Sequence, residues 1–216
     1  DGTNWNNTFN WHGAYHFDQQ NWETYNQITV SEFAFVIDSV TDILWSTIDP
    51  SDKDHVFLSS FRGGLIELQN GQWLNRHTYY NSSLQTRIGQ GGNNVCIAST
   101  SFDNSGNLWV SNSFVNEPLS VYTADGDWMS FNCGSVASNQ LCTDILVDPI
   151  YGYVWMAIKS VGLLVYDFNQ TPTDISDDQY RILTTAEGNG KLPNNVVNTI
   201  VSDRDGEIWI GTEEGP

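Results

Sequence analysis

One pattern of apolar and polar residues recurs four times along the chain. In each copy an apolar run is followed by a short turn and then by a second apolar segment with an aromatic residue near its middle. These aromatic anchors are Phe57, Trp109, Trp155 and Trp209, and they are spaced by 52, 46 and 54 residues. Spacing of this length indicates stacked units of one supersecondary structure.

The residues around each anchor predict four short antiparallel strands per unit. The turns before the anchors, at residues 103–106, 148–152 and 203–206, begin with Asp and contain Gly, as hairpin connections do. Third strands are predicted at residues 64–68, 118–122 and 162–166, and fourth strands carry Trp73, Trp128 and, in the third unit, Tyr180. Four short strands per unit without helical periodicity predict an all-β fold, a β-propeller.

The two central strands of each unit are nearly continuous apolar runs. A blade packs against a neighbour on both faces, so both faces of its middle strands are expected to be buried. Six of the nine Trp residues occupy repeat positions and are expected to fill the wedges between blades: Trp22, Trp73, Trp109, Trp128, Trp155 and Trp209.

Residues 1–216 are predicted to form one domain, and its predicted blades differ in length. Three complete blades are expected at residues 41–80, 95–132 and 142–184, and half-blades at 13–26 and 197–212. Two interpretations follow: the half-blades complete each other in a small closed ring, or the chain is a fragment of a larger propeller. The fragment is favoured because Asp1 is not an initiator residue. Strand 207–212 is then expected to pair with residues 13–18 of its own or a neighbouring chain, because exposed edges recruit strands.

Charge narrows the classes of partner. The chain has a formal net charge of −18 and only eight Lys and Arg residues, which disfavours nucleic acids and anionic membrane surfaces. Aromatic residues make up 13% of the chain, which indicates a packed core. No apolar run approaches the ~20 residues of a membrane-spanning helix.

The residues provide no catalytic or metal-binding motif. No nucleophile elbow, phosphate loop or HExxH is present. Of the four His only His12 and His16 lie close together in the sequence, and two ligands alone make no metal site. We therefore expect a non-enzymatic protein without a cofactor or metal. The three cysteines, Cys96, Cys133 and Cys142, fit no zinc pattern. They are interpreted as buried small residues. Alternatively, Cys133 and Cys142, which flank a short loop, form a disulfide.

Two groups of residues are candidate ligand sites. Trp5, Phe9 and Trp11 lie outside the repeats among amide side chains, which suits stacking on a sugar. The alternative is a loop tucked against the neighbouring blade. Basic residues gather between positions 53 and 87, and four of their number are candidates for binding an anionic glycan: Arg62, Arg76, His77 and Arg87.

The segments DGEIWIGT (205–212) and SGNLWV (105–110) resemble the two-component regulator propeller repeat. That repeat occurs in periplasmic sensors of hybrid histidine kinases and in PorZ-type surface proteins of the Bacteroidetes type IX secretion system. The uneven blades, with GAYHFD (13–18) and GTEEGP (211–216), resemble the second group more. This resemblance implies a cell-surface scaffold that presents anionic lipopolysaccharide to the sortase PorU, with PorV and PorQ as partners. The alternative it implies is a periplasmic carbohydrate-sensing propeller of a hybrid histidine kinase.

Overall fold

The computed structural model describes residues 8–26, 28–29, 40–92 and 94–215. These residues form sixteen β-strands in five antiparallel sheets, and none of them lies in a helix. No helix of the described residues could therefore cross a membrane. The first half of the strands are Ala14–Phe17 (β1), Trp22–Tyr25 (β2), Ile43–Asp49 (β3), Asp52–Ser60 (β4), Gly64–Gln69 (β5), Gln72–His77 (β6), Cys96–Phe102 (β7) and Leu108–Ser113 (β8). The second half are Leu119–Tyr122 (β9), Trp128–Phe131 (β10), Cys142–Val147 (β11), Val154–Ile158 (β12), Gly162–Asp167 (β13), Gln179–Leu183 (β14), Val197–Ser202 (β15) and Ile208–Thr212 (β16).

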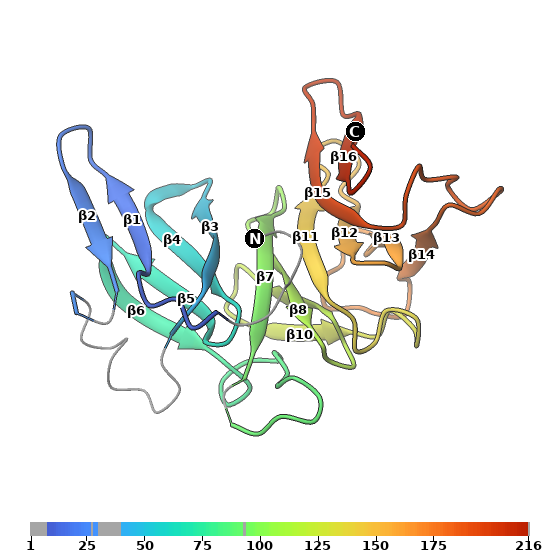
Figure 1. Cartoon of the computed structure of the whole chain (residues 1–216). Helices are drawn as coiled ribbons and strands as arrows, with labels where there is room; N and C mark the ends of the chain where they lie inside the picture. The colour runs from blue at the N-terminus through green and yellow to red at the C-terminus, as the bar shows by residue number, and fades with distance from the viewer. Residues whose placement is uncertain (1–7, 27, 30–39, 93, 216) are drawn as a thin grey trace.

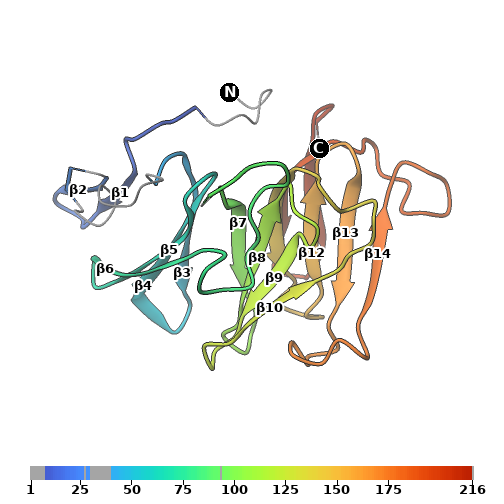
Figure 2. The same cartoon turned by 90° about the horizontal axis from the view of Figure 1, so that it is seen from below.

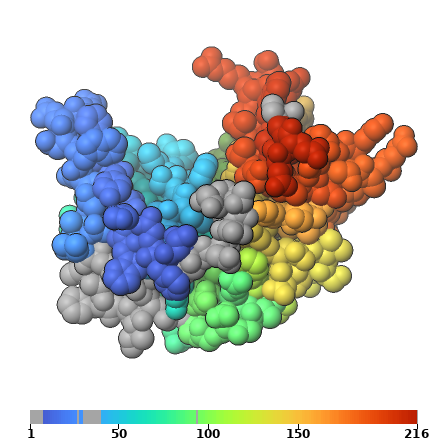
Figure 3. Space-filling view, in the orientation of Figure 1, coloured from blue at the N-terminus to red at the C-terminus, as the bar shows by residue number. Residues whose placement is uncertain are grey.

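The sheets are the blades of a propeller. Strands β3–β6, β7–β10 and β11–β14 form three four-stranded meanders, and β1–β2 and β15–β16 form two-stranded sheets. Figure 1 shows the five sheets following one another in an open arc, and Figure 2 shows the same succession from below. The space-filling view shows the two-stranded sheets standing apart at the two ends of the arc (Figure 3). All four aromatic anchors lie in second strands, as predicted, and the predicted fold class is confirmed.

The closed ring considered from the sequence is not formed. Among the described strands β16 pairs only with β15, and β1 pairs only with β2. The expected pairing between residues 207–212 and 13–18 is therefore wrong within one chain. Pairing with a neighbouring chain stays a prediction.

A separate apolar cluster fills each of the four wedges between successive sheets. The largest lies between β7–β10 and β11–β14, where the fully buried Trp109 ring stacks on Phe131 at 5.3 Å and contacts Phe168 at 4.6 Å between ring centroids. Such aromatic contacts bury large areas of apolar surface. The wedges, rather than a single central core, thus hold the fold together.

The expectation that all six repeat-position Trp residues fill wedges is wrong for two of them. Trp22 is 68% exposed and Trp209 is 56% exposed. Both belong to the two-stranded sheets, which pack against a described blade on one face only. A side chain on the other face has no described strand to cover it.

The three cysteines are free and buried. Cys133 and Cys142 both belong to the wedge around Trp109, where burial raises the pKa of the Cys142 thiol to about 12. They therefore act as small apolar residues, the first of the two interpretations from the sequence.

One buried carboxylate joins three successive blades. Asp144 in β11 accepts hydrogen bonds from the Ser99 hydroxyl in β7 at 3.0 Å, from the Thr199 hydroxyl in β15 at 3.0 Å and from the Ile200 N–H at 2.9 Å. The N–H of Ile145 donates to the same group. Asp144 is only 3% exposed, so water cannot replace these bonds. The carboxylate fixes the spacing of the first strands.

Replacing this carboxylate should destabilise the whole domain. We expect Asp144→Ala to lower the free energy of unfolding by about 2–4 kcal/mol, because it leaves buried hydroxyl and N–H donors without an acceptor. Urea unfolding followed by Trp fluorescence measures this change. The exposed Asp125 provides the control, since Asp125→Ala should change stability by less than about 0.5 kcal/mol. Equal stabilities of the two variants would contradict the role of Asp144.

Candidate functional site

The structure brings two of the predicted arginines onto one surface. The guanidinium of Arg62, in the β4–β5 hairpin, lies 5.1 Å from the centre of the Phe9 ring, and that of Arg87 lies 4.0 Å from the centre of the Phe114 ring. Phe61 connects the two pairs, because its ring meets Phe114 edge-on at 6.2 Å. We call these residues the arginine–aromatic face: Phe9, Phe61, Arg62, Arg87 and Phe114.

Backbone hydrogen bonds hold the two arginines close to each other. The Val95 N–H donates to the Arg62 carbonyl at 3.2 Å, and the Arg87 N–H donates to the carbonyl of Asn94 at 2.9 Å. Both positive charges act on the thiol of Cys96. Burial raises the pKa of this thiol to about 11, and the charges of Arg87 and Arg62 partly oppose that rise. Both arginines are half-buried, and neither forms an ion pair with a described carboxylate.

Asp42 positions the aromatic part of this face. Its carboxylate accepts hydrogen bonds from the N–H groups of Thr8, Phe9 and Asn10 at 2.9–3.1 Å, and its own N–H donates to the Asn10 carbonyl. These bonds hold the segment before β1 in place, with Phe9 in reach of Arg62. Asp42 and Phe114 were not recognised from the sequence, because their contacts join segments that are far apart along the chain.

The remaining predicted site residues are placed differently. Arg76 is 8% exposed and its Nε donates to the Gly63 carbonyl at 2.5 Å, so its side chain points toward the hairpin that carries Arg62. His77 is 2% exposed and lies inside a wedge. Trp11 is 58% exposed, and Trp5 lies outside the described residues. The predicted sugar-stacking group is thus represented by two exposed rings, Phe9 and Trp11.

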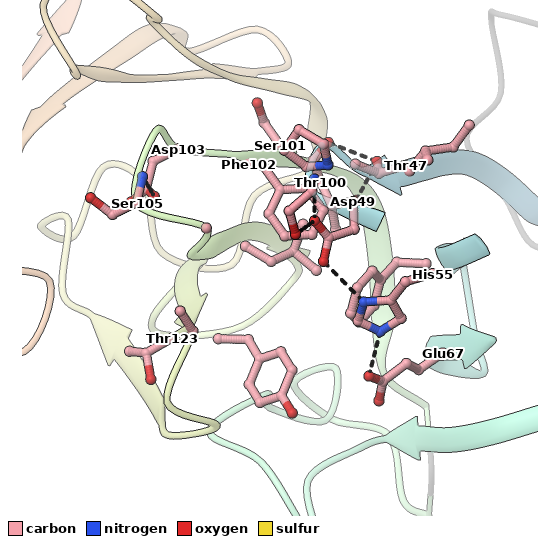
Figure 4. A pocket seen from close by; sticks show the side chains of 18 of the residues that line it. Thr47, Asp49, His55, Glu67, Thr100, Ser101, Phe102, Asp103, Ser105 and Thr123 are labelled. Carbon is pink, nitrogen blue, oxygen red and sulfur yellow. Dashed lines mark hydrogen bonds and ion pairs between the residues drawn. The ribbon is translucent and has the colours of Figure 1, made fainter. Parts of the chain in front are cut away.

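A second site lies between the first and second complete blades and was not predicted. This inter-blade cleft has a volume of about 1060 Å³ and is lined by side chains of β3, β4 and β5 on one side and of β7, β8 and β9 on the other. Figure 4 shows His55 and Glu67 across an open space from Asp103, Ser105 and Thr123.

A chain of hydrogen-bonded His and carboxylate side chains runs from the cleft into the wedge. His55 lies between two carboxylates, with Nδ1 3.0 Å from Asp49 Oδ2 and Nε2 2.7 Å from Glu67 Oε1. The other oxygen of Glu67 is 2.9 Å from Nε2 of His77. Glu67 is 5% exposed, so its charge is stabilised by these two rings rather than by water. We call Asp49, His55, Glu67 and His77 the histidine–carboxylate chain.

Burial and hydrogen bonding act against each other on these groups. Burial alone would lower the pKa of His55, but the hydrogen bonds to Glu67 and Asp49 outweigh it and the pKa is raised. Burial alone would raise the pKa of Glu67, but the hydrogen bonds from His77 and His55 outweigh it and the pKa is lowered. Both groups therefore favour their charged forms.

The histidine–carboxylate chain occurs in only one of the three complete blades. Phe57 pairs across its sheet with Glu67, whereas the equivalent anchors Trp109 and Trp155 pair with Val121 and Val165. The position of His77 is occupied by Phe131 and Leu183 in the other two blades. Comparing the repeats position by position is the sequence signal that identifies this site. Among the described residues, no group of three or more His, Cys, Asp or Glu is arranged to hold a metal ion.

The histidine–carboxylate chain should make stability depend on pH in a defined window. The contribution of His55 is complete below its unfolded pKa of 6.5 and is lost as pH rises through its higher folded pKa. The contribution of Glu67 is present above its unfolded pKa of 4.5 and is lost as pH falls through its lower folded pKa. The two overlap fully between about pH 4.5 and 6.5.

We therefore expect Glu67→Gln to cost about 2 kcal/mol of unfolding free energy at pH 5.5 and clearly less at pH 8.5. Urea unfolding at both pH values measures the difference. Glu187→Gln, at an exposed position, is the control and should change stability little at either pH. A cost for Glu67→Gln that is the same at both pH values would rule out this coupling.

Comparisons with known proteins agree with the fold. Residues 191–214, which include β15 and β16, match the family model of the two-component regulator propeller. No curated protein matches the chain in sequence. Among solved structures, PorZ, an essential surface component of the type IX secretion system of Porphyromonas gingivalis, superimposes with a TM-score of 0.81 at 20% identity, over 93% of this chain and 28% of that one.

Two other solved propellers show how widely the fold is shared. The extracellular domain of the hybrid two-component system BT4673 of Bacteroides thetaiotaomicron matches with a TM-score of 0.66 at 18% identity, over 97% of this chain and 24% of that one. Virginiamycin B lyase of Staphylococcus aureus, an enzyme, matches with a TM-score of 0.57 at 12% identity, over 92% and 55%. The chain thus spans about a quarter of the length of the surface and sensor proteins. It is a β-propeller that carries a two-component regulator propeller repeat at residues 191–214, as the sequence resemblance predicted.

Proposed function

We propose that this chain is a propeller of a non-enzymatic cell-surface scaffold protein of the PorZ type, and that its arginine–aromatic face binds anionic lipopolysaccharide for presentation to the sortase. The observation that carries the proposal is the pair of guanidinium groups, Arg62 and Arg87, held over aromatic rings on one surface of a chain with a net charge of −18. The likeness to PorZ supports it.

The geometry suits a phosphorylated or carboxylated glycan. An acidic protein repels anions on average, so a site for an anion needs a local concentration of positive charge. Arg62 and Arg87 provide it, and their donors are not bound to described carboxylates. Exposed Phe9 and Trp11 lie on the segment that Asp42 holds beside Arg62, where they can stack on sugar rings.

The proposed location and partners follow from the same role. A PorZ-type scaffold would act in the periplasm and at the outer-membrane surface, with PorU, PorV and PorQ in the attachment complex. The similar solved structures include a surface component and extracellular domains, which supports this location.

A second candidate function rests on two other comparisons. The family match at residues 191–214 and the likeness to the BT4673 extracellular domain favour a periplasmic carbohydrate-sensing propeller of a hybrid histidine kinase. The rest of the gene distinguishes the two candidates. A transmembrane segment followed by a kinase domain would establish the sensor, and a β-sandwich domain without them would favour the scaffold.

Removing both arginines should weaken binding of anionic lipopolysaccharide at least tenfold. Each charge-assisted hydrogen bond contributes about 1.5–3 kcal/mol when sheltered, and less at half-buried positions such as these. Calorimetry compares the wild type with Arg62→Ala/Arg87→Ala at low and physiological salt, and wild-type affinity should fall as salt rises. Arg76 is left unchanged because its side chain supports the hairpin through Gly63.

The matched control is Arg204→Ala/Lys191→Ala, which removes the same charge from two exposed positions at the other end of the arc. It should bind like the wild type. Equal losses in both double variants would show that only overall charge matters. An absence of wild-type binding would exclude lipopolysaccharide as the ligand of this chain.

A further inference from the structure

The inter-blade cleft opens at the wedge where the first complete blade differs from the other two complete blades. In the second and third complete blades the anchor is Trp and its cross-strand partner is Val. In the first blade the anchor is the smaller Phe57, and its partner is the charged Glu67. The smaller ring leaves space, and the carboxylate makes that space polar. The cleft of about 1060 Å³ is lined by both residues, and its volume is just above the ~300–1,000 Å³ typical of small-molecule sites.

The walls of the cleft combine aromatic faces with hydroxyl groups. Trp45, Phe102 and Tyr122 supply rings, and Trp45 is 45% exposed although it lies on the first strand of its blade. Hydroxyl groups come from Thr47, Thr100, Ser105 and Thr123, whereas the Ser101 hydroxyl accepts the Val147 N–H of the next blade. The Tyr122 ring is held by stacking on Trp128 at 4.9 Å, and its hydroxyl makes no hydrogen bond to a described residue. A hydroxyl held in place without a partner is suited to binding a ligand.

We propose that the inter-blade cleft is a binding site for a neutral sugar of one or two rings, separate from the arginine–aromatic face. Trp45 stacks on one face of the sugar, and the hydroxyl groups of the two blades, together with that of Tyr122, bind its hydroxyls. This is the arrangement of apolar faces and a few fixed polar groups that small-molecule sites use.

The charges of the lining select against other ligands. Among the described residues, three carboxylates and no Lys or Arg line the cleft, so an anion is repelled: Asp49, Glu67 and Asp103. An amine is disfavoured for a different reason, because these carboxylates are already bound. Asp103 accepts from two backbone N–H groups, the Asn107 amide and the Trp109 indole, and Asp49 and Glu67 accept from side chains within their own blade. The polar groups of the lining that remain available to a ligand are mostly neutral hydroxyl groups.

The inference goes beyond the proposed function and does not rest on it. The cleft is lined by the first strands β3 and β7 and by the turns β3–β4, β7–β8 and β9–β10, whereas the arginine–aromatic face is built on the β4–β5 hairpin and on residues 87 and 114. The two sites also bind ligands of different charge. A failure of lipopolysaccharide binding would leave the sugar site unaffected, and the reverse also holds.

The experiment uses the full 216-residue chain and five neutral disaccharides: maltose, cellobiose, lactose, mannobiose and chitobiose. Saturation-transfer NMR identifies the binders, and calorimetry then compares variants on the best of them. We expect millimolar or tighter binding of at least one disaccharide and an at least tenfold loss with Trp45→Ala, because the stacking face is removed. Trp22→Ala removes an even more exposed ring outside the cleft and should bind like the wild type.

A second variant tests the origin of the cleft. Phe57→Trp/Glu67→Val restores the residues found at these positions in the other blades, and it should abolish sugar binding while thermal unfolding remains cooperative. Its failure to fold would leave the result with Trp45→Ala to decide. Binding of none of the five sugars, equal binding by wild type and Trp45→Ala, or preference for putrescine over every sugar would overturn the proposal.

Discussion

The structure depends on one constraint: the middle strands of a blade are apolar on both faces and can be buried only between two neighbours. Each wedge between successive sheets therefore needs its own apolar cluster, and the clusters are filled mainly by residues of the second and third strands. Trp109, fully buried between two complete blades, satisfies the constraint. Trp209, at the equivalent repeat position, is 56% exposed because only one face of its sheet is covered by described strands. A Trp at this repeat position is therefore buried or exposed according to whether a neighbouring sheet covers it.

A repeated Asp shows how the same residue type makes different connections in different blades. Asp144 and Asp42 both precede Ile at the start of a first strand. Asp144 accepts hydrogen bonds from the blades on either side. Asp42 instead accepts three N–H groups of residues 8–10 and thereby sets Phe9 beside Arg62. The buried acceptor is therefore needed at both positions, but what it fixes is determined by the segment that supplies the donors.

Much of the fold could be predicted from the sequence because the determinants are local and repeated. Asp–Gly turns and apolar runs identify hairpins, and the regular recurrence of Trp identifies second strands, so all four anchors were placed correctly. The site was harder to predict because its contacts cross between strands and blades. His55 and Glu67 are twelve residues apart, and Arg87, in the loop between β6 and β7, meets Phe114, which follows β8. Neither contact follows a periodicity, and the burial of Arg76 and His77 depends on packing that a strand assignment does not contain.

The histidine–carboxylate chain is best understood from its energetic cost. Burying Glu67 and His77 requires desolvating them, and a buried ionic network is often no more stabilising than apolar side chains of similar volume. The other two complete blades show what those apolar side chains are in this fold, with Val at one position and Phe or Leu at the other. Apolar side chains can therefore occupy both positions in this fold, but the blade beside the cleft carries Glu67 and His77 there instead. Glu67, held by the His55 and His77 rings, instead makes the floor of this wedge polar at the place where a hydroxyl-lined cleft opens between the first two complete blades.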